Sequence, residues 1–204
     1  ESERMLHAKV DQIGVETQRK VVMEEKRQRI DNRPYATWIG ELYKRAFKEH
    51  PYRWQPIGSM DHLAAATEED YKKFYKTFYV PNNATLSIAG DIDIKQTKAW
   101  IEKYFSDIPK GGEIPRPNIV EPPLKEEIRD IIYDNINLPA VAIGYRIPKQ
   151  GTKEAYALEM ASDILSSGES SRFRKSIIDG QQIAIQAYAF AMANEDPGLF
   201  MSFG

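Results

Sequence analysis

The sequence predicts an α+β protein in which antiparallel sheets are covered by helices. The first 31 residues contain no proline and are rich in Glu, Lys, Arg and Gln, which favours helix. Short alternations of apolar and polar residues, typical of half-buried strands, appear at residues 84–90 and again after residue 126. This mixture of helices and strands indicates antiparallel sheets with helices packed on them.

The first part of the chain is predicted to be mainly helical. One long helix covers residues 1–31, and a second covers residues 34–49, shortly before a proline stops it. A third follows Thr67-Glu-Glu-Asp70, which resembles a capping box, and a fourth follows the Asp91-Ile-Asp93 cap. The strand at residues 84–90 lies between these last two helices. Apolar stripes expected in the core are Trp38, Leu42, Tyr43 and Phe47; Tyr71, Phe74, Tyr75 and Phe78; and Trp100, Ile101, Tyr104 and Phe105.

A shift in composition divides the chain. Residues 106–123 hold five prolines and two glycines in eighteen positions, which indicates a linker or a long crossing loop. We therefore place a domain boundary near residue 120, between residues 1–120 and 121–204.

The second part is predicted to contain four strands and two helices. The strands are expected at residues 127–133, 140–147, 183–192 and 199–203, and the helices at 152–166 and 170–179. The residues expected to face inward on the longer helix are Ala157, Met160, Ala161, Ile164 and Leu165.

Composition argues against several classes of protein. The 28 basic and 30 acidic residues nearly cancel, so no overall field favours a nucleic acid or an anionic membrane as partner. Without cysteine there is no disulfide framework and no thiolate metal site, and both the cytoplasm and the periplasm remain open as compartments. No apolar run approaches the roughly 20 residues that cross a bilayer. Because the sequence starts with Glu and stops inside an expected strand, we expect a soluble internal fragment of a longer protein.

Common catalytic motifs are not found in the sequence. The three histidines, His7, His50 and His62, have no neighbouring ligands at metal-site spacing and are expected at the surface or at helix ends. No nucleophile elbow, Walker loop or dinucleotide fingerprint occurs.

The stretch Gln18-Arg-Lys-Val-Val-Met-Glu-Glu25 offers one candidate. At about 100° per residue, one narrow line of the helix holds Gly14, Gln18, the midpoint of Val21 and Val22, and Glu25. Glu25 is thus predicted to point inward with the valines, while Glu24 lies on the flank. An inward carboxylate costs several kcal/mol unless it meets a cation, hydrogen-bond donors or a metal. Geometry alone favours Arg19, Arg29 or another basic side chain as the partner of Glu25 over a metal.

The ordered succession of several stretches resembles a known family. These are Gln18 to Glu25, Asp31-Asn-Arg-Pro34, His50-Pro-Tyr52 with Ile57-Gly58, Glu69-Asp70 through Tyr79-Val-Pro-Asn-Asn-Ala84, Gly90-Asp-Ile-Asp93, Pro139 to Tyr145, and Ile164-Leu165 with Gly168 and Ser170-Ser-Arg172. In this order they resemble the pitrilysin/insulinase family of zinc metallopeptidases, which includes the mitochondrial processing peptidases. The resemblance covers essentially the whole chain.

The resemblance implies a role for Glu25. In that family two histidines of an inverted H-x-x-E-H motif and a Glu on a later helix hold zinc, and the Glu of the motif is the general base. Glu25 matches the later Glu, whereas Gln18 stands where relatives have a second Glu. No H-x-x-E-H occurs in these residues, and the family places it upstream. The resemblance therefore implies that residues 1–120 end the zinc-bearing domain and residues 121–204 begin the next pitrilysin-like domain. Zinc is then expected in the parent protein, not on this chain alone, which is expected to be inactive.

Two further positions depart from the family pattern. Active members use an Arg and, seven residues later, a Tyr to bind substrate, and the matching positions here are Ile178 and Ile185. A later repeat or a partner subunit could supply these groups, or the protein could be a non-catalytic scaffold of the same fold. The resemblance also implies peptides or unfolded polypeptides as substrates, and the remaining domains of the parent chain or a partner subunit as partners.

Overall fold

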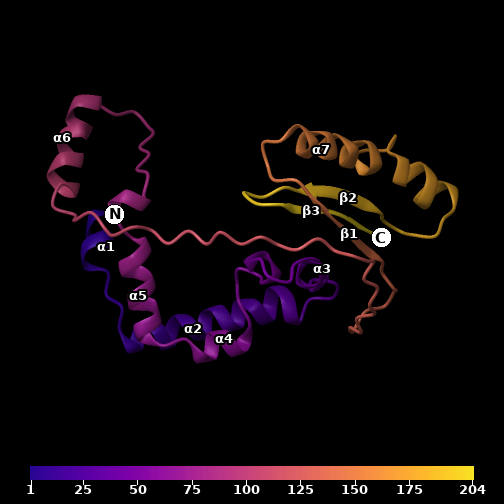
Figure 1. Ribbon diagram of the computed structural model, residues 1–204, viewed down its shortest axis with the longest axis horizontal. Coiled ribbons are helices and arrows are strands. Elements are labelled where there is room, and N and C mark those ends of the chain that lie inside the picture. Colours follow the sequence, from indigo (N-terminus) through magenta and orange to yellow (C-terminus); the bar gives the residue numbers. More distant parts are fainter. The chain divides into compact units, whose positions relative to one another are not determined.

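The computed structural model describes residues 1–204 and combines helices with one small antiparallel sheet (Figure 1). The chain forms two compact units. The first contains Glu1–Glu25 and Ile57–Asn118, and the second contains Lys26–Pro56 and Ile119–Gly204. Because residues 26–56 pack with the later part of the chain, the units do not follow the order of the sequence.

The first unit is helical. Its elements are α1 (Ser2–His7), α2 (Gln12–Lys26, which ends one residue into the second unit), α4 (Met60–Ala65), α5 (Glu68–Phe78), η3 (Pro81–Asn83) and α6 (Ile94–Phe105). Two predicted caps are confirmed. Thr67 and Asp70 form the capping box of α5, and the Asp93 side chain accepts a 2.7 Å hydrogen bond from the Gln96 backbone N–H at the start of α6.

Several expectations for the first unit were wrong. The long helix predicted over residues 1–31 is interrupted after His7, because Ala8 leaves the helical conformation (φ −57°, ψ 120°). The short helix α4 was not predicted, although Ser59 caps it by accepting a hydrogen bond from the His62 N–H. The aromatic stripes of α5 and α6 are not core residues. No side chain of either helix is buried. Several of the predicted core residues are in fact exposed, namely Tyr71, Phe74, Trp100 and Tyr104.

The second unit is built on a three-stranded sheet. Strands β1 (Ala142–Ile147), β2 (Tyr188–Met192) and β3 (Gly198–Phe203) pair antiparallel in the order β1-β3-β2. The central strand alternates from Leu199 onward, because Leu199, Met201 and Phe203 are buried on one face. The register pairs Gly144 and Phe190 with Met201.

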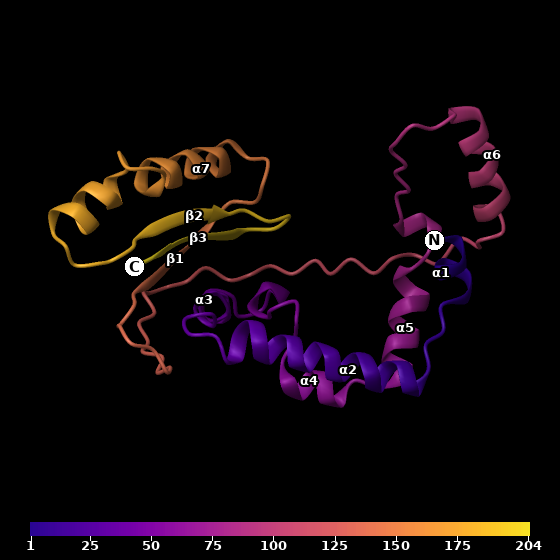
Figure 2. The ribbon, with the colours of Figure 1, turned by 180° about the vertical axis from the view of Figure 1, so that it is seen from behind.

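Helices cover both faces of this sheet. Helix α3 (Trp38–Ala46) packs against β1 and α7 (Lys153–Ser166) packs against β2, and the two helices lie on opposite faces (Figures 1 and 2). The remaining elements of the unit are η1 (Arg27–Asp31), η2 (Pro51–Arg53) and η4 (Arg174–Gly180), of which η1 and η4 are π-helical.

The apolar stripe predicted for the second helix forms the centre of this unit. Tyr43 and Phe47 are buried with Leu199 and Met201, and Leu42 packs against the same cluster. The Trp38 ring meets three aromatic rings of the sheet, those of Tyr188, Phe190 and Phe203. Helix α3 begins four residues later than predicted, since Tyr35 adopts a positive φ of 63°.

The inward face of α7 differs from the prediction. Ala155 and Ser162 are buried, whereas Met160 and Ile164 are exposed. Two predicted strands are also wrong, because residues 84–90 and 127–133 have no regular secondary structure and pair with no other strand. Their apolar side chains are exposed, for example Leu86 (47%) and Tyr133 (91%).

No helix combines the length and the apolar character that crossing a membrane requires.

Candidate functional site

Glu25 lies in the last turn of α2. Its side chain is half-buried, whereas the neighbouring Glu24 and the upstream Gln18 are exposed. Both glutamates have interaction partners in the structure. The two adjacent carboxylates therefore differ in surroundings as the helical geometry predicts.

The predicted inward line of the helix was nevertheless wrong in detail. Val15 is the buried residue of α2, and Val21, expected to point inward, is 54% exposed. The half-buried Arg19, Val22 and Lys26 follow Val15 at helical spacing. Glu25 thus stands at the edge of the buried face and not at its centre.

Arg19, one candidate partner for Glu25, makes its hydrogen bonds and ion pair with other residues. Its guanidinium donates to the backbone carbonyls of Ala64 (3.1 Å) and Ala66, and so caps the last turn of α4. It also lies 3.3 Å from a Glu16 carboxylate oxygen. Arg19 therefore joins α2 to α4 within the first unit.

The histidines do not form a metal site. His7 is exposed and pairs with Glu3 at 2.8 Å, and His62 lies exposed in α4. His50 is buried and caps the start of η2, where its Nδ1 accepts from the Tyr52 N–H at 3.2 Å. Its Nε2 therefore carries the proton and donates to Asp196 at 3.2 Å.

No group of three or more His, Cys, Asp or Glu side chains in the chain could hold a metal ion. Zinc in a catalytic site takes three protein ligands and one water. The half-buried carboxylate of Glu25 is of a type that can serve as one such ligand. These residues do not contain the three protein ligands that a catalytic zinc site requires.

The two substituted positions lie in the second unit. Ile178 is half-buried in η4, and Ile185 is 81% exposed in the extended segment before β2. Neither side chain can replace an Arg or a Tyr as a hydrogen-bond donor to a substrate.

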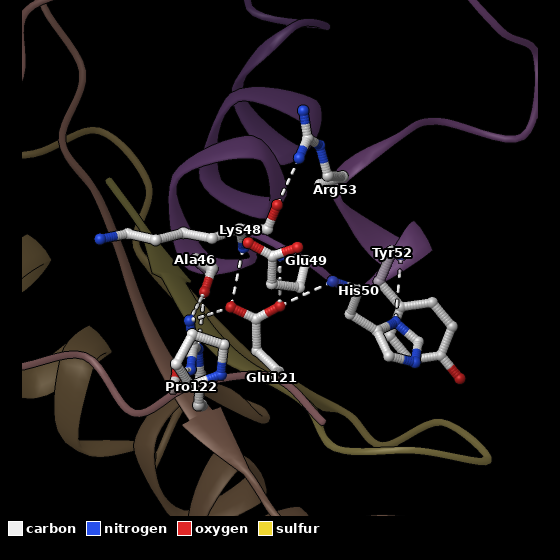
Figure 3. A network of polar contacts seen from close by, with 9 residues as sticks. Ala46, Lys48, Glu49, His50, Tyr52, Arg53, Glu121 and Pro122 are labelled. Carbon is white, nitrogen blue, oxygen red and sulfur yellow. Dashed lines mark hydrogen bonds and ion pairs between the residues drawn. The ribbon is translucent and has the colours of Figure 1, made fainter. Parts of the chain in front are cut away.

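Sequence reasoning missed a densely connected polar cluster, which we call the Glu121 clamp (Figure 3). The Glu121 carboxylate accepts three consecutive backbone N–H groups, those of Lys48 (2.8 Å), Glu49 (2.8 Å) and His50 (2.7 Å). Arg146 on β1 lies 3.0 Å from the same carboxylate and donates to the Ala46 carbonyl at 2.6 Å. The clamp joins the end of α3, the end of the linker and β1.

The surroundings of Glu121 favour the ionised form of its carboxyl, which the clamp requires. Burial acts to raise the pKa of its carboxyl, but the three N–H donors and the Arg146 guanidinium outweigh burial and hold the pKa below its ordinary value. No local motif marks Glu121 in the sequence, because its backbone donors are 71 to 73 positions away.

Residues 65–202 match the family described as Peptidase M16 inactive domain. The chain belongs to the M16 peptidase family. The resemblance found in the sequence is therefore confirmed, and so is the α+β class with an antiparallel sheet covered by helices.

M16 relatives have the same fold and a longer chain. The zinc protease PqqE of Helicobacter pylori is 33% identical over 187 residues, which are 90% of this chain and 42% of that protein. The crystal structure of a protease from Helicobacter pylori superposes with a TM-score of 0.85 at 32% identity, over 99% of this chain and 49% of that one. The periplasmic protease PqqL from Escherichia coli shares the fold at 24% identity, with a TM-score of 0.67 over 99% of this chain and 23% of that one. The chain thus spans less than half the length of the M16 proteins it matches.

Proposed function

We propose that these residues are part of a zinc-dependent endopeptidase that hydrolyses peptides, in which Glu25 is the third zinc ligand. Membership of the M16 family and similarity to a protein named as a zinc protease support a protease as the parent. The observation that carries the assignment of Glu25 is its place in the last turn of α2, half-buried beside an exposed glutamate.

The chemistry proposed for Glu25 is simple. Zinc, when bound, polarises a water molecule and a peptide carbonyl. Glu25 would contribute one anionic oxygen ligand, and the two imidazoles and the general base would come from an H-x-x-E-H motif outside residues 1–204. Gln18 lacks the charge of the Glu found at that position in relatives, so it would offer hydrogen bonds only.

The proposed organisation of the parent follows from the same assignment. Residues 1–120 would complete the zinc-bearing domain, and residues 121–204 would begin the next pitrilysin-like domain. The partners would be a peptide or an unfolded polypeptide as substrate, together with the other domains of the parent chain or a partner subunit. This fits relatives in which the matching segment is under half of the chain.

Zinc analysis of the full-length parent tests the proposal. Glu25→Gln and Glu25→Ala are expected to lose the roughly one zinc ion per chain that a catalytic site holds. Glu24→Gln is the matched control, because it removes a charge from the adjacent exposed position, and it is expected to keep the zinc. Circular dichroism confirms that each variant is folded. Unchanged zinc content in both folded Glu25 variants would overturn the assignment.

A second function, a non-catalytic scaffold or assembly subunit of the same fold, is favoured by three substitutions. Gln18, Ile178 and Ile185 replace polar groups that active family members use. Under this alternative the upstream sequence would lack the two histidines, and the unmodified parent would hold no zinc. An intact H-x-x-E-H upstream together with bound zinc would exclude it.

A further inference from the structure

Both π-helical turns of this protein are spanned by an ion pair between residues five apart. In η1 the Lys26 Nζ lies 2.5 Å from an Asp31 carboxylate oxygen. In η4 the Arg174 Nε lies 3.0 Å from an Asp179 carboxylate oxygen. Ion pairs within the α-helices span three or four residues, as in Glu16–Arg19, Glu41–Arg45 and Glu68–Lys72.

Helix geometry explains this difference. In an α-helix, residues five apart point about 140° away from each other, whereas residues three or four apart are neighbours. A π-helical turn has backbone hydrogen bonds to the fifth residue back, which brings such side chains to the same side. These hydrogen bonds are present. The Asn32 N–H donates to the Arg27 carbonyl at 2.8 Å, and the Gln181 N–H donates to the Ser176 carbonyl at 2.9 Å. The Lys26–Asp31 pair is therefore compatible with the π-helical turn and not with an α-helical one.

The Lys26–Asp31 pair lies directly beside the proposed zinc ligand. Lys26 follows Glu25 and ends α2, and its positive charge is favourable at the C-terminal end of a helix. The side chains of Lys26 and Asp31 are 15% and 34% exposed, less than those of the pair in η4 (40% and 55%). Asp31 also opens the Asp31-Asn-Arg-Pro34 stretch, to which the sequence alone assigns no chemistry.

A π-helical turn adds about one residue to a helix, which changes the phase between the segments before and after it by about 100°. If η1 relaxed to an α-helical turn, the backbone hydrogen bonds directly after α2, next to Glu25, would be rearranged. The last turn of α2, which carries Glu25, would then end differently.

We propose that Lys26 and Asp31 are positioning residues for Glu25, because their ion pair holds the π-helical turn that fixes the end of α2. The proposal rests on the proposed function, in which Glu25 binds zinc. Neither side chain contacts the metal in this role. Asp31 affects Glu25 only by stabilising the turn at the end of α2. The pair needs one positive and one negative side chain, and which position carries which charge matters less.

The first experiment requires no zinc. Hydrogen exchange of the 204-residue chain should show the Asn32 amide exchanging roughly two- to fivefold faster in Asp31→Asn and Lys26→Met, since the loss of a partly exposed ion pair has this size. Asp179→Asn is the matched control, because it breaks the equivalent pair in η4. It should accelerate Gln181 and leave Asn32 unchanged. An Asn32 amide that exchanges at the same rate in all variants would refute the structural part of the proposal.

The second experiment measures the metal in the full-length parent. Loss of a residue that orients a ligand typically weakens metal binding by about 10- to 100-fold, so Asp31→Asn and Lys26→Met should weaken zinc by at least about tenfold. They should also shift the visible absorption of the Co²⁺-substituted protein. The double variant Lys26→Asp, Asp31→Lys restores an ion pair of reversed sign. It should recover part of the affinity, because a negative charge at position 26 is unfavourable at the C-terminal end of α2. Asp179→Asn should change neither readout.

The outcomes separate the two proposals. If Glu25→Gln retains zinc, the proposed function fails, whatever the Asp31 variants do. If Glu25→Gln loses zinc while Asp31→Asn and Lys26→Met bind it as the unmodified parent does, the zinc ligand stands and the positioning role is refuted. Failure of the charge-reversed double variant to recover any affinity would also refute the role assigned to the ion pair.

Discussion

Replacement of Glu121 by Gln tests whether one carboxylate holds the second unit together. The substitution keeps the shape of the side chain and removes its charge. Oε1 accepts from Lys48 N–H and faces Arg146, and Oε2 accepts from the N–H groups of Glu49 and His50. An amide can present only one oxygen, so either the Arg146 side or the Glu49 and His50 side of the clamp would face an NH₂ group.

The structure gives the size of the effect. Hydrogen bonds to charged groups contribute about 1.5–3 kcal/mol each, and breaking a buried ion pair costs about 3–5 kcal/mol. Only 9% of the Glu121 side chain and 18% of the Arg146 side chain are exposed, so solvent screens the pair little. Arg146 keeps its hydrogen bond to the Ala46 carbonyl, which reduces the loss. We expect the free energy of unfolding to fall by about 3 kcal/mol, at the lower end of the range for buried pairs.

Urea denaturation of the second unit measures this change. Trp54 and Trp100 are exposed and can be replaced by Phe, which leaves the packed Trp38 as the reporter of the α3–sheet core. A loss of about 3 kcal/mol lowers the urea midpoint by roughly 1–2 M. Glu127→Gln, which removes a glutamate paired with Arg129 at the surface, is the control and should leave the midpoint unchanged.

The pH dependence of the free energy of unfolding tests independently whether the charged form of Glu121 is the stabilising one. Because the folded pKa of Glu121 lies below its ordinary value, the clamp stabilises the fold fully above the unfolded pKa of about 4.3 and is lost as the pH falls through the folded pKa. The difference between the unmodified chain and Glu121→Gln should therefore be largest near neutral pH and shrink in acid. A midpoint unchanged at neutral pH, or a difference that grows on acidification, would refute this account of the clamp.

Two further predictions concern the core and the activity. Leu199→Ala should lower the free energy of unfolding by about 2–5 kcal/mol, because the Leu199 side chain is fully buried, and the same Trp38 urea titration measures it. The 204-residue chain alone should show no zinc-dependent cleavage of an unstructured fluorogenic peptide, because one carboxylate without two imidazoles does not hold catalytic zinc. Cleavage that survives purification and is abolished by Glu25→Gln would contradict this last expectation.

The sequence predicts those elements whose signals are local. The capping box of Thr67 and Asp70 confirms α5, and the Asp93 cap confirms α6. Strands β1 and β3 were predicted within two residues of their observed bounds, because apolar alternation and flanking turns are visible in the sequence itself. The stripe on α3 was also correct, since its residues meet the sheet as an amphipathic helix requires.

Features that depend on distant partners were not predictable in this way. Residues 84–90 and 127–133 have the pattern of strands, but a strand needs a neighbour to pair with, and none lies beside them. The exposure of Met160 on α7 reflects where the sheet lies, which periodicity does not reveal. Glu121 carries no signal at all, because its role depends on three backbone groups of a distant segment.

The candidate site shows the same limit. Helical spacing distinguished Glu25 from Glu24, and their exposures agree with that distinction, but the identity of Glu25 as a ligand depends on the family resemblance. The π-helical turn that follows could not be foreseen, because Lys26 and Asp31 are five apart and would not be paired on an α-helix.

The distribution of the core explains why polar clamps matter in this protein. The largest fully buried side chains are Phe47, Leu199 and Met201, all in the contact between the α3 segment and β3. Outside this contact the buried apolar side chains include small ones such as Val15, Ala155 and Ala189, so hydrogen bonds and ion pairs contribute more to fixing those segments. Glu121 does this for the end of the linker through backbone N–H groups, which do not depend on the neighbouring side chains. At the end of α2 the Lys26–Asp31 pair is assigned the same task. Because the Asp31 carboxylate is more exposed than that of Glu121, this pair should break first when the fold is weakened.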